Sequence, residues 1–232
     1  MTARPGVFDD VLAAAERLQQ LVPDAVLVGG TAASLYAGHR VSFDDDHVVR
    51  DLRERFAEIL DCLEASEGWV TARVRPGRVI LGSFDGIETG VLQLRRTRPL
   101  EVTELHVKGH RLRVPTADEM LRVKSWMIVY RNATRDFVDV AALASRFGLA
   151  SSGGVLSAMD EYYADQHEAG RGVTSQLVRM LAEPRPYDLD SVDLGSYRQL
   201  EPRWHEWSRV EQTCGELAVQ VLAAVVGGGD AT

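Results

Sequence analysis

The stretch that most constrains the fold runs from Val26 to Val49 and reads VLVGGTAASLYAGHRVSFDDDHVV. An apolar run ends there in Gly29 and Gly30, a short alanine-rich segment follows, and three aspartates then stand side by side. A strand that ends in two glycines lets the backbone approach a ligand closely. The N–H groups at the start of the following helix suit an anionic group such as phosphate. The pattern therefore predicts a strand, a short helix and a second segment that carries an acidic group.

The aspartates at positions 44 to 46 are expected to divide between the two faces of a strand. In a strand over residues 42–49, Asp44 and Asp46 point the same way and the aspartate between them points the opposite way. Two carboxylates on one face suit a hard divalent cation such as Mg²⁺, which takes oxygen ligands and keeps phosphate and water in its remaining positions. Ser42 lies on the same face, one step earlier. The alternative is an acidic turn that stabilises the start of a helix at Asp51.

The rest of the chain divides into helical and strand-like parts. Apolar groups at helical spacing predict helices over residues 7–21 and 51–66. Alternation broken by Pro-Gly, Asp-Gly and Lys-Gly pairs predicts antiparallel strands over residues 69–113. Helical patterns return over residues 116–147 and again after residue 151. This order predicts an α+β fold with a mixed or antiparallel sheet flanked by helices, and a helical C-terminal part.

The segment Ser-Ser-Gly-Gly at 151–154 is the expected domain boundary. It separates a core domain, residues 1–150, from a helical C-terminal extension, residues 151–232. The final residues, GGGDAT from position 227, are expected to be disordered, as the ends of a chain often are.

Composition places the chain among ordinary globular proteins. Of its 232 residues 45% are hydrophobic and 26% are charged, which suffices for a buried core. No apolar run approaches the roughly 18 residues of a membrane span, and the first residues lack the apolar region of a signal peptide. The two cysteines, Cys62 and Cys214, have no metal-ligand spacing, and so low a count fits a reducing compartment. We therefore expect a cytoplasmic protein that does not enter a membrane.

The formal net charge of −8 argues against a protein that binds nucleic acid with its whole surface. It leaves room for a local basic groove. Candidates for such a groove are the arginines of the strand-like region, at positions 73, 75, 78, 95, 96 and 98. The same arginines are equally compatible with a solvated face, and an acidic chain also suits a cationic small molecule.

Two blocks of the sequence resemble the AbiEii/AbiGii-type (MenT-like) nucleotidyltransferases of the DNA-polymerase-β-like superfamily. The first block, VGGTAASLYAGHRVSFDDD, is similar to that family's strand, Gly-Gly-Thr helix and metal-binding aspartates. The second, VPTADEMLRVKSWMIVYRNATRDFVDVAALAS, is similar to a segment in which a helix carries one lysine and the pattern Arg-Asp-x-x-Asp follows. The blocks lie within residues 26–147, in the family's order.

The resemblance implies Mg²⁺-dependent transfer of a nucleoside monophosphate from a nucleoside triphosphate (NTP) to an acceptor hydroxyl. It implies a metal site at Asp44 and Asp46 that holds one or two Mg²⁺ ions. The implied catalytic residues are Ser42, Asp44, Asp46, Lys124 and Asp139, and the implied NTP-binding residues are Gly29, Gly30, Thr31, Arg40, Ser42 and Lys124.

The chemistry gives each of these residues a role. Charge builds on phosphate oxygens during the transfer, so positioning and electrostatic stabilisation carry most of the catalysis. Lys124 is expected to neutralise the β- and γ-phosphates as a point charge. Asp139 is expected to orient that lysine or to accept the proton of the acceptor. Asp136 shares its helix face and, with Arg135, has the alternative role of a charge pair at the helix start.

One position departs from the family's pattern. Superfamily members commonly carry a third carboxylate on a later strand, and the equivalent position in DGIETGVLQL is Gly90. Glu88 lies two residues away on the same face and is the candidate substitute. With two carboxylates alone, the site has no assigned general base.

The resemblance also implies partners. Relatives of this type add nucleotides to the 3′ end of tRNA as toxins of type IV toxin–antitoxin systems, so an RNA acceptor and a cognate antitoxin protein are expected. An antibiotic (aminoglycoside-type) nucleotidyltransferase is the enzyme alternative. A degenerate fold that binds a nucleotide or a protein without turnover is the other alternative, and the missing third carboxylate favours it. The intact set of Ser42, Asp44, Asp46, Lys124 and Asp139 argues against it.

Overall fold

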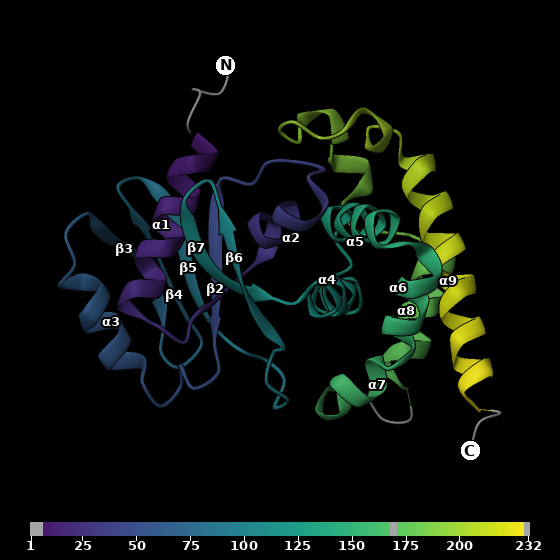
Figure 1. Ribbon diagram of the computed structural model, residues 1–232, viewed down its shortest axis with the longest axis horizontal. Coiled ribbons are helices and arrows are strands. Elements are labelled where there is room, and N and C mark those ends of the chain that lie inside the picture. The colour runs from purple at the N-terminus through teal and green to yellow at the C-terminus, as the bar shows by residue number, and fades with distance from the viewer. Residues whose placement is uncertain (1–6, 168–170, 230–232) are drawn as a thin grey trace. The chain divides into compact units, whose positions relative to one another are not determined.

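The computed structural model describes residues 7–167 and 171–229 (Figure 1). The chain forms two compact units. Unit 1 holds the chain up to Ala32 together with Val41–Thr116, and unit 2 holds Ala33–Arg40 together with the chain from Ala117 onward. Helix α2 (Gly29–Ala37) therefore begins in unit 1 and ends in unit 2.

Unit 1 contains a five-stranded sheet in the order β1-β2-β5-β4-β3. Its strands are β1 (Val26–Val28), β2 (Asp44–Val49), β3 (Trp69–Arg75), β4 (Val79–Phe84) and β5 (Ile87–Gln93). Strand β2 pairs with β5 in parallel, whereas the other neighbouring pairs are antiparallel. A hairpin of β6 (Val102–Val107) and β7 (His110–Pro115) forms a second, two-stranded sheet. The predicted α+β fold with a mixed sheet flanked by helices is confirmed.

Helix α1 (Val7–Leu21) supplies one side of the unit 1 core. It packs against β2, β5 and β7, and its Leu12 and Leu18 are fully buried. Helix α3 (Phe56–Glu64) adds Ile59 and Leu63 to the same core. The helix predicted over residues 7–21 matches α1, whereas the one predicted from residue 51 begins only at Phe56, because residues 51–55 form turns.

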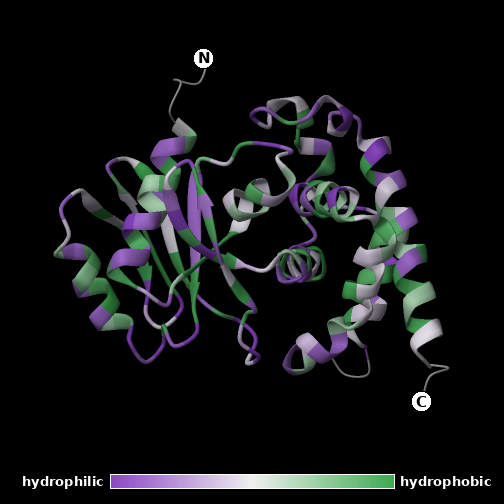
Figure 2. Ribbon diagram, in the orientation of Figure 1, coloured by the Kyte–Doolittle hydropathy of each residue, from purple (hydrophilic) through white to green (hydrophobic). Residues whose placement is uncertain are grey.

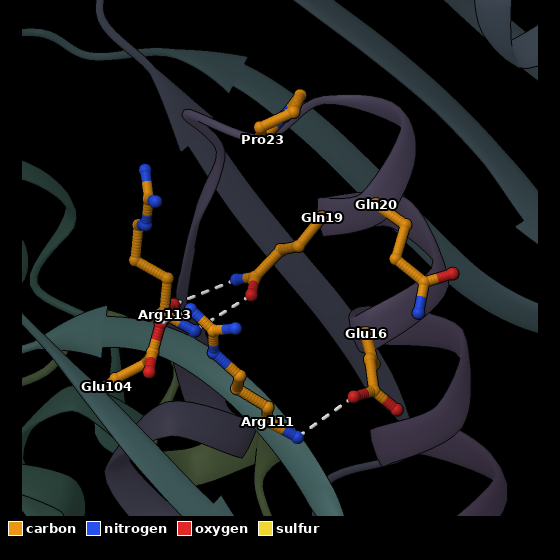
Figure 3. A pocket seen from close by; sticks show the side chains of 7 residues that line it. All are labelled: Glu16, Gln19, Gln20, Pro23, Glu104, Arg111 and Arg113. Carbon is orange, nitrogen blue, oxygen red and sulfur yellow. Dashed lines mark hydrogen bonds and ion pairs between the residues drawn. The ribbon is translucent and has the colours of Figure 1, made fainter.

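Two side chains of α1 cover the outer edge of β7 (Figure 3). The Glu16 carboxylate accepts a hydrogen bond from the backbone N–H of Arg111 at 3.0 Å. The Gln19 side-chain amide accepts one from the N–H of Arg113 and donates one to its carbonyl oxygen, both at 2.8 Å. An exposed strand edge is a template for pairing with another chain, and these bonds close it at both residues.

Unit 2 is helical. Its α-helices besides the end of α2 are α4 (Ala117–Arg131), α5 (Thr134–Phe147), α6 (Leu149–Ser157), α7 (Met159–Tyr162), α8 (Val173–Ala182) and α9 (Trp207–Gly229). Short 3₁₀ turns lie at Ala164–Gln166, Leu189–Ser191, Leu194–Ser196 and Pro202–Trp204. Helices α6 and α8 pack along α9, and α4 packs against α5. Among the described residues, no helix is both long and apolar enough to cross a membrane.

The segment Ser-Ser-Gly-Gly does not form a linker, because residues 151–154 lie inside helix α6. The small residues serve close packing instead: a Cβ added at Gly153 would lie 2.7 Å from the backbone carbonyl carbon of Gln220 in α9. The units divide the chain after Thr116, and the division at 150 into a catalytic core and an extension stays a prediction. Of the tail expected to be disordered, residues 227–229 continue α9 and residues 230–232 lie outside the described residues.

The C-terminal half of α9 is largely apolar on the hydropathy scale (Figure 2). Val219, Leu222 and Val226 are at least half exposed there. Their spacing of three and four residues places them on one side of the helix.

Gly153→Ala should lower the free energy of unfolding by about 1–3 kcal/mol, because the added methyl group overpacks α6 against α9. Gly154→Ala is the matched control, since no atom outside its own helix lies within 4 Å of a Cβ at that position. The control should raise the free energy of unfolding by about 0.5–1 kcal/mol, because alanine is the better helix former. Urea denaturation measures both values, and equal effects of the two substitutions would contradict this packing.

Candidate active site

The residues proposed from the sequence fall into two clusters, one in each unit. The carboxylate cluster of unit 1 consists of Gly29, Thr31, Ser42, Asp44 and Asp46. The Asp139 cluster of unit 2 consists of His39, Arg40, Lys124 and Asp139. Each is described within its own unit.

The carboxylate cluster depends on the alternation along β2. Asp44 and Asp46 are partly exposed, whereas Asp45 and His47 between and after them are fully buried. The strand predicted for this segment is confirmed, with Asp44 as its first residue. The two carboxylates therefore share one face of the sheet.

Two hydroxyl groups hold the start of β2. Ser42 Oγ donates to Asp44 Oδ1 at 2.6 Å, and Thr31 Oγ1, from the first turn of α2, donates to the Asp44 backbone oxygen at 2.6 Å. Both residues are buried. The two hydroxyls, predicted to contact the NTP, thus fix the position of the Asp44 carboxylate and backbone.

Glycines frame the Asp46 carboxylate. Gly29 has a φ of +71°, and a Cβ there would lie 3.2 Å from Asp46 Oδ2. Gly90, the register partner of Asp46 on β5, leaves space that a Cβ would fill at 2.8 Å from Asp46 Oδ1. The absence of a side chain at both positions makes room for this carboxylate. Gly29 and Gly30 are not a turn before α2 but its first two residues.

Glu88 is the register partner of Asp44, and partners on parallel strands point to the same face. Within residues 7–167 and 171–229, however, no three His, Cys, Asp or Glu side chains are grouped so that they could hold a metal ion. The structure therefore supports a pair of carboxylates and does not add Glu88 as a third ligand.

The opposite face of β2 carries a buried polar group that sequence reasoning left without a role. Thr89 Oγ1 donates to Asp45 Oδ2 at 3.1 Å, and His47 Nδ1 lies 3.4 Å from Asp45 Oδ1. Burial raises the pKa of the Asp45 carboxyl, and the neighbouring His47 and Thr89 oppose part of that rise. Asp45 thus faces the interior of unit 1, away from the carboxylate pair.

The Asp139 cluster is a buried ion network. Asp139 lies on α5 and Lys124 on α4, and the Lys124 ammonium is 2.7 Å from Asp139 Oδ2. Arg40 contacts both carboxylate oxygens, through Nε at 2.8 Å and Nη2 at 3.1 Å. His39 Nε2 lies 2.8 Å from Asp139 Oδ1, and because an ionised carboxylate only accepts, this nitrogen carries the proton.

These donors determine the protonation of Asp139. Burial by itself would raise the pKa of the Asp139 carboxyl, but the charges of Arg40 and Lys124 and the hydrogen bond from His39 outweigh it and hold the pKa well below its ordinary value. An ionised carboxylate with a depressed pKa is a weak base. Asp139 is therefore suited to orienting Lys124 and Arg40 rather than to accepting a proton.

Sequence reasoning placed Lys124 and Asp139 together and missed His39. The signal for His39 was its place directly before Arg40 in the first block. The alternative for Asp136, a charge pair with Arg135, is wrong, because Asp136 is fully buried and binds Arg131 at 2.6 and 2.8 Å.

Comparison with solved structures shows a nucleotidyltransferase-like fold. A Helicobacter pylori protein proposed to be a nucleotidyltransferase matches with a TM-score of 0.55 and 14% identity, over 100% of this chain and 99% of that chain. The crystal structure of JHP933 from Helicobacter pylori matches with a TM-score of 0.54 and 15% identity, over 99% of this chain and 96% of that chain. At these identities the likeness shows the fold alone.

Comparison with curated sequences finds similarity to mycobacterial proteins named MmpL11. "Heme uptake protein MmpL11" of Mycobacterium tuberculosis is 30% identical over 237 residues, which are 91% of this chain and 22% of that protein. "Mycolic acid-containing lipids exporter MmpL11" of Mycolicibacterium smegmatis is 35% identical over 136 residues, which are 58% of this chain and 14% of that protein. The chain spans at most about a fifth of the length of these relatives. No family model matches it.

Asp139→Asn should lower the free energy of unfolding at pH 7 by about 3–5 kcal/mol, because it leaves two buried cations without their counter-charge. The depressed pKa fixes the sign of the pH effect: Asp139 stabilises the fold above the ordinary aspartate pKa, about 3.9, and this contribution is lost as pH falls toward the folded-state pKa. The difference between wild type and variant should therefore shrink below about pH 4.

Chemical denaturation across pH measures this difference. Asp190→Asn, which changes an exposed carboxylate of the same unit, is the control and should stay within about 0.5 kcal/mol of wild type. A difference between wild type and Asp139→Asn that does not change with pH would contradict the assigned ionisation.

Proposed function

We propose that this chain is a Mg²⁺-dependent nucleotidyltransferase that transfers a nucleoside monophosphate from an NTP to an acceptor hydroxyl. The observation that carries the proposal is the pair Asp44 and Asp46, which share one face of β2 in a nucleotidyltransferase-like fold. Gly29 and Gly90 lie beside the Asp46 carboxylate, and their lack of side chains leaves space for it.

The donor set fits the proposed ion. Mg²⁺ prefers oxygen ligands and is commonly bound by one or two carboxylates together with substrate phosphates. Asp44 and Asp46 supply those carboxylates, and the bond from Ser42 fixes the orientation of Asp44. When bound, the ion neutralises charge that develops on the transferring phosphoryl group and helps to align the reactants.

The start of α2 is the proposed phosphate contact. Gly29 and Gly30 open this helix directly after β1, so the positive end of the helix dipole lies there. The start of a helix favours an anionic ligand. Thr31 and Ser42 act indirectly, because both donate to Asp44.

Lys124 is proposed to supply positive charge to the β- and γ-phosphates. A lysine ammonium acts on phosphate as a point charge. The Lys124 side chain is only 3% exposed, and the contact of its ammonium with Asp139 Oδ2 at 2.7 Å limits its conformations. Arg40 shares the same carboxylate and is proposed to contact the NTP from there.

The proposed acceptor is the 3′ end of an RNA, most simply tRNA, and the proposed role is that of the toxin of a type IV toxin–antitoxin pair with a cognate antitoxin. These finer proposals follow from the resemblance of the two sequence blocks. An aminoglycoside acceptor is the competing proposal, and both are tested by the choice of acceptor. The transport named for the MmpL11 proteins belongs to chains of which this one covers about a fifth, and no group of the described residues argues for it.

Transfer of label from α-³²P-NTPs to total RNA in the presence of Mg²⁺ tests the proposal. Asp44→Asn and Asp46→Asn should each reduce the initial rate at least about 100-fold, because charge stabilisation in the transition state is lost. Asp45→Asn is the matched control from the same run of aspartates. Its side chain faces the core, and an amide can still bond Thr89, so the rate should stay near that of wild type.

Equal labelling by wild type and by Asp46→Asn, or no labelling by either with any of the four NTPs, would remove the enzyme proposal. Transfer of label to an aminoglycoside rather than to RNA would change the proposed acceptor. The proposed reaction, nucleotidyl transfer, would remain. Removal of Mg²⁺ with EDTA should abolish labelling, and its return should restore it.

A further inference from the structure

Unit 1 contains an apolar hollow that the proposed function does not use. Its volume is about 150 Å³. Its lining contains three charged residues and a set of apolar ones. The apolar residues are Val26, Val48, Leu94, Pro99, Leu100 and Val102. One water occupies about 30 Å³ of liquid, so this space accepts a group the size of a small ring system rather than a whole nucleotide.

The hollow continues the sheet face that carries the carboxylates. On β2, Val48 follows Asp46 by two residues and so points the same way, about 7 Å further along the strand. On β1, the register partner of Val48 is Val26, and that of Asp46 is Val28. The hollow therefore lies along β2 on the far side of Asp46 from Ser42 and Asp44, and Val48 is its lining residue two positions from Asp46.

Two cations, Arg50 and Arg113, line this hollow. Among the described residues, neither guanidinium group makes a hydrogen bond or an ion pair. Asp24, the acidic residue of the lining, is already paired with Arg55 at 2.9 Å. Glu104, the register partner of Arg113, interacts with it electrostatically, although its carboxylate binds Arg111. The hollow thus combines an apolar interior with two guanidinium groups, which suits a ligand with a flat apolar part and an anionic part.

A buried arginine shapes the wall of the hollow. Arg96 is 3% exposed, and its guanidinium donates to the backbone oxygens of Arg98 and Pro99, both at 3.0 Å. These bonds hold the segment that contributes Pro99 and Leu100. The sequence left Arg96 open between a basic groove and a solvated face, and its burial argues against both: it is a structural residue. At the mouth, Val102 is 45% exposed.

A second hollow of about 380 Å³ adjoins the first at Arg113, which lines both. Figure 3 shows it between α1 and the β6–β7 hairpin. Its acidic residues are engaged: Glu104 binds Arg111 at 2.5 Å, and Glu16 binds His110 at 2.8 Å. Arg113 is the one residue that the linings of the two hollows share.

We propose that the apolar hollow receives the base of one nucleotide of a single-stranded acceptor, while the phosphate of that nucleotide lies against Arg50 and Arg113. This inference rests on the proposed function, which it deepens by placing the acceptor. Single-stranded nucleic acid is held by groups that pack on its bases and by cations that follow its backbone, and the hollow offers both. Arginine also stacks on flat rings.

The position favours the acceptor strand over the incoming NTP. The groups proposed for the triphosphate, at the start of α2, lie at the Asp44 end of the site, since Val28 is level with Asp46 and Gly29 and Gly30 follow it. The hollow lies beyond Asp46 in the other direction. In an in-line transfer the attacking and leaving oxygens lie on opposite sides of the phosphorus, so the acceptor belongs on this side.

Fluorescence anisotropy with a labelled single-stranded RNA of about eight nucleotides, in Mg²⁺ and without NTP, tests the inference. Arg50→Gln and Arg113→Gln should each raise the Kd about 5- to 10-fold and reduce the slope of log Kd against log salt by about 0.7. Val102→Glu should raise the Kd at least about 5-fold, because it brings a carboxylate to the mouth and displaces the base.

Matched controls use exposed residues of unit 1 that do not line either hollow. Lys108→Gln and Val70→Glu should leave the Kd near that of wild type, because both side chains are exposed and neither belongs to the lining of a hollow. Controls that weaken binding as much as the hollow variants, or hollow variants without effect, would overturn the inference. A rise in the KM for NTP at unchanged Kd for RNA would also overturn it, since the hollow would then hold the incoming nucleotide.

Binding requires no transfer, so the two proposals fail separately. A wild-type chain that binds the oligonucleotide with this variant pattern but labels no RNA would refute the proposed reaction and leave the binding site standing. Labelling that persists in Arg50→Gln, Arg113→Gln and Val102→Glu at an unchanged KM for RNA would refute the site and leave the reaction standing.

Discussion

The two-residue alternation of β2 is the constraint on which the rest of unit 1 depends. One side of the strand carries Asp45, His47 and Val49 into the core under α1, and this burial fixes the strand's register. The other side must then present Asp44, Asp46 and Val48 in line. A slip by one residue would bury the carboxylate pair and expose the core residues. The packing of the core therefore determines the position of the candidate site.

Two glycines complete the arrangement of the carboxylate site. Gly29 and Gly90 flank the Asp46 carboxylate at distances where a Cβ would compete for its space. Gly90 occupies the position at which a third carboxylate was expected, and its lack of a side chain is what allows Asp46 to lie as it does. The absence of a third carboxylate at this position is thus accommodated by the local packing, and the candidate site remains a pair of carboxylates.

In unit 2 the main constraint is a different one, the burial of charged groups. Taking ions out of water is costly unless each has partners. Asp139 binds Arg40, Lys124 and His39 at distances of 2.7 to 3.1 Å, so the buried charges compensate one another. The result is a lysine and an arginine that are held against one carboxylate with few conformations available to them. Pre-positioned charge of this kind is what phosphoryl transfer requires of a protein.

Much of this could be predicted from the sequence because the signals are local. Helical spacing predicted both ends of Val7–Leu21, and strand alternation separated Asp45 from its neighbours. Tertiary partners were harder to predict. His39 meets Asp139 across 100 positions of the chain. Gly153 and Gly154 look like part of a linker, and the packing of Gly153 against α9 is visible only in the tertiary structure. The burial of Arg96 likewise depends on the conformation of a loop, which the periodicity of the sequence does not predict.

The most direct test of the central claim is electron paramagnetic resonance of Mn²⁺, used in place of Mg²⁺, with a non-hydrolysable NTP. The account predicts that the wild type binds the Mn²⁺–nucleotide complex, that Asp46→Asn loses it, and that Asp45→Asn retains it. Binding that survives in Asp46→Asn, or that is lost equally in Asp45→Asn, would contradict the assignment of the metal to the exposed face of β2.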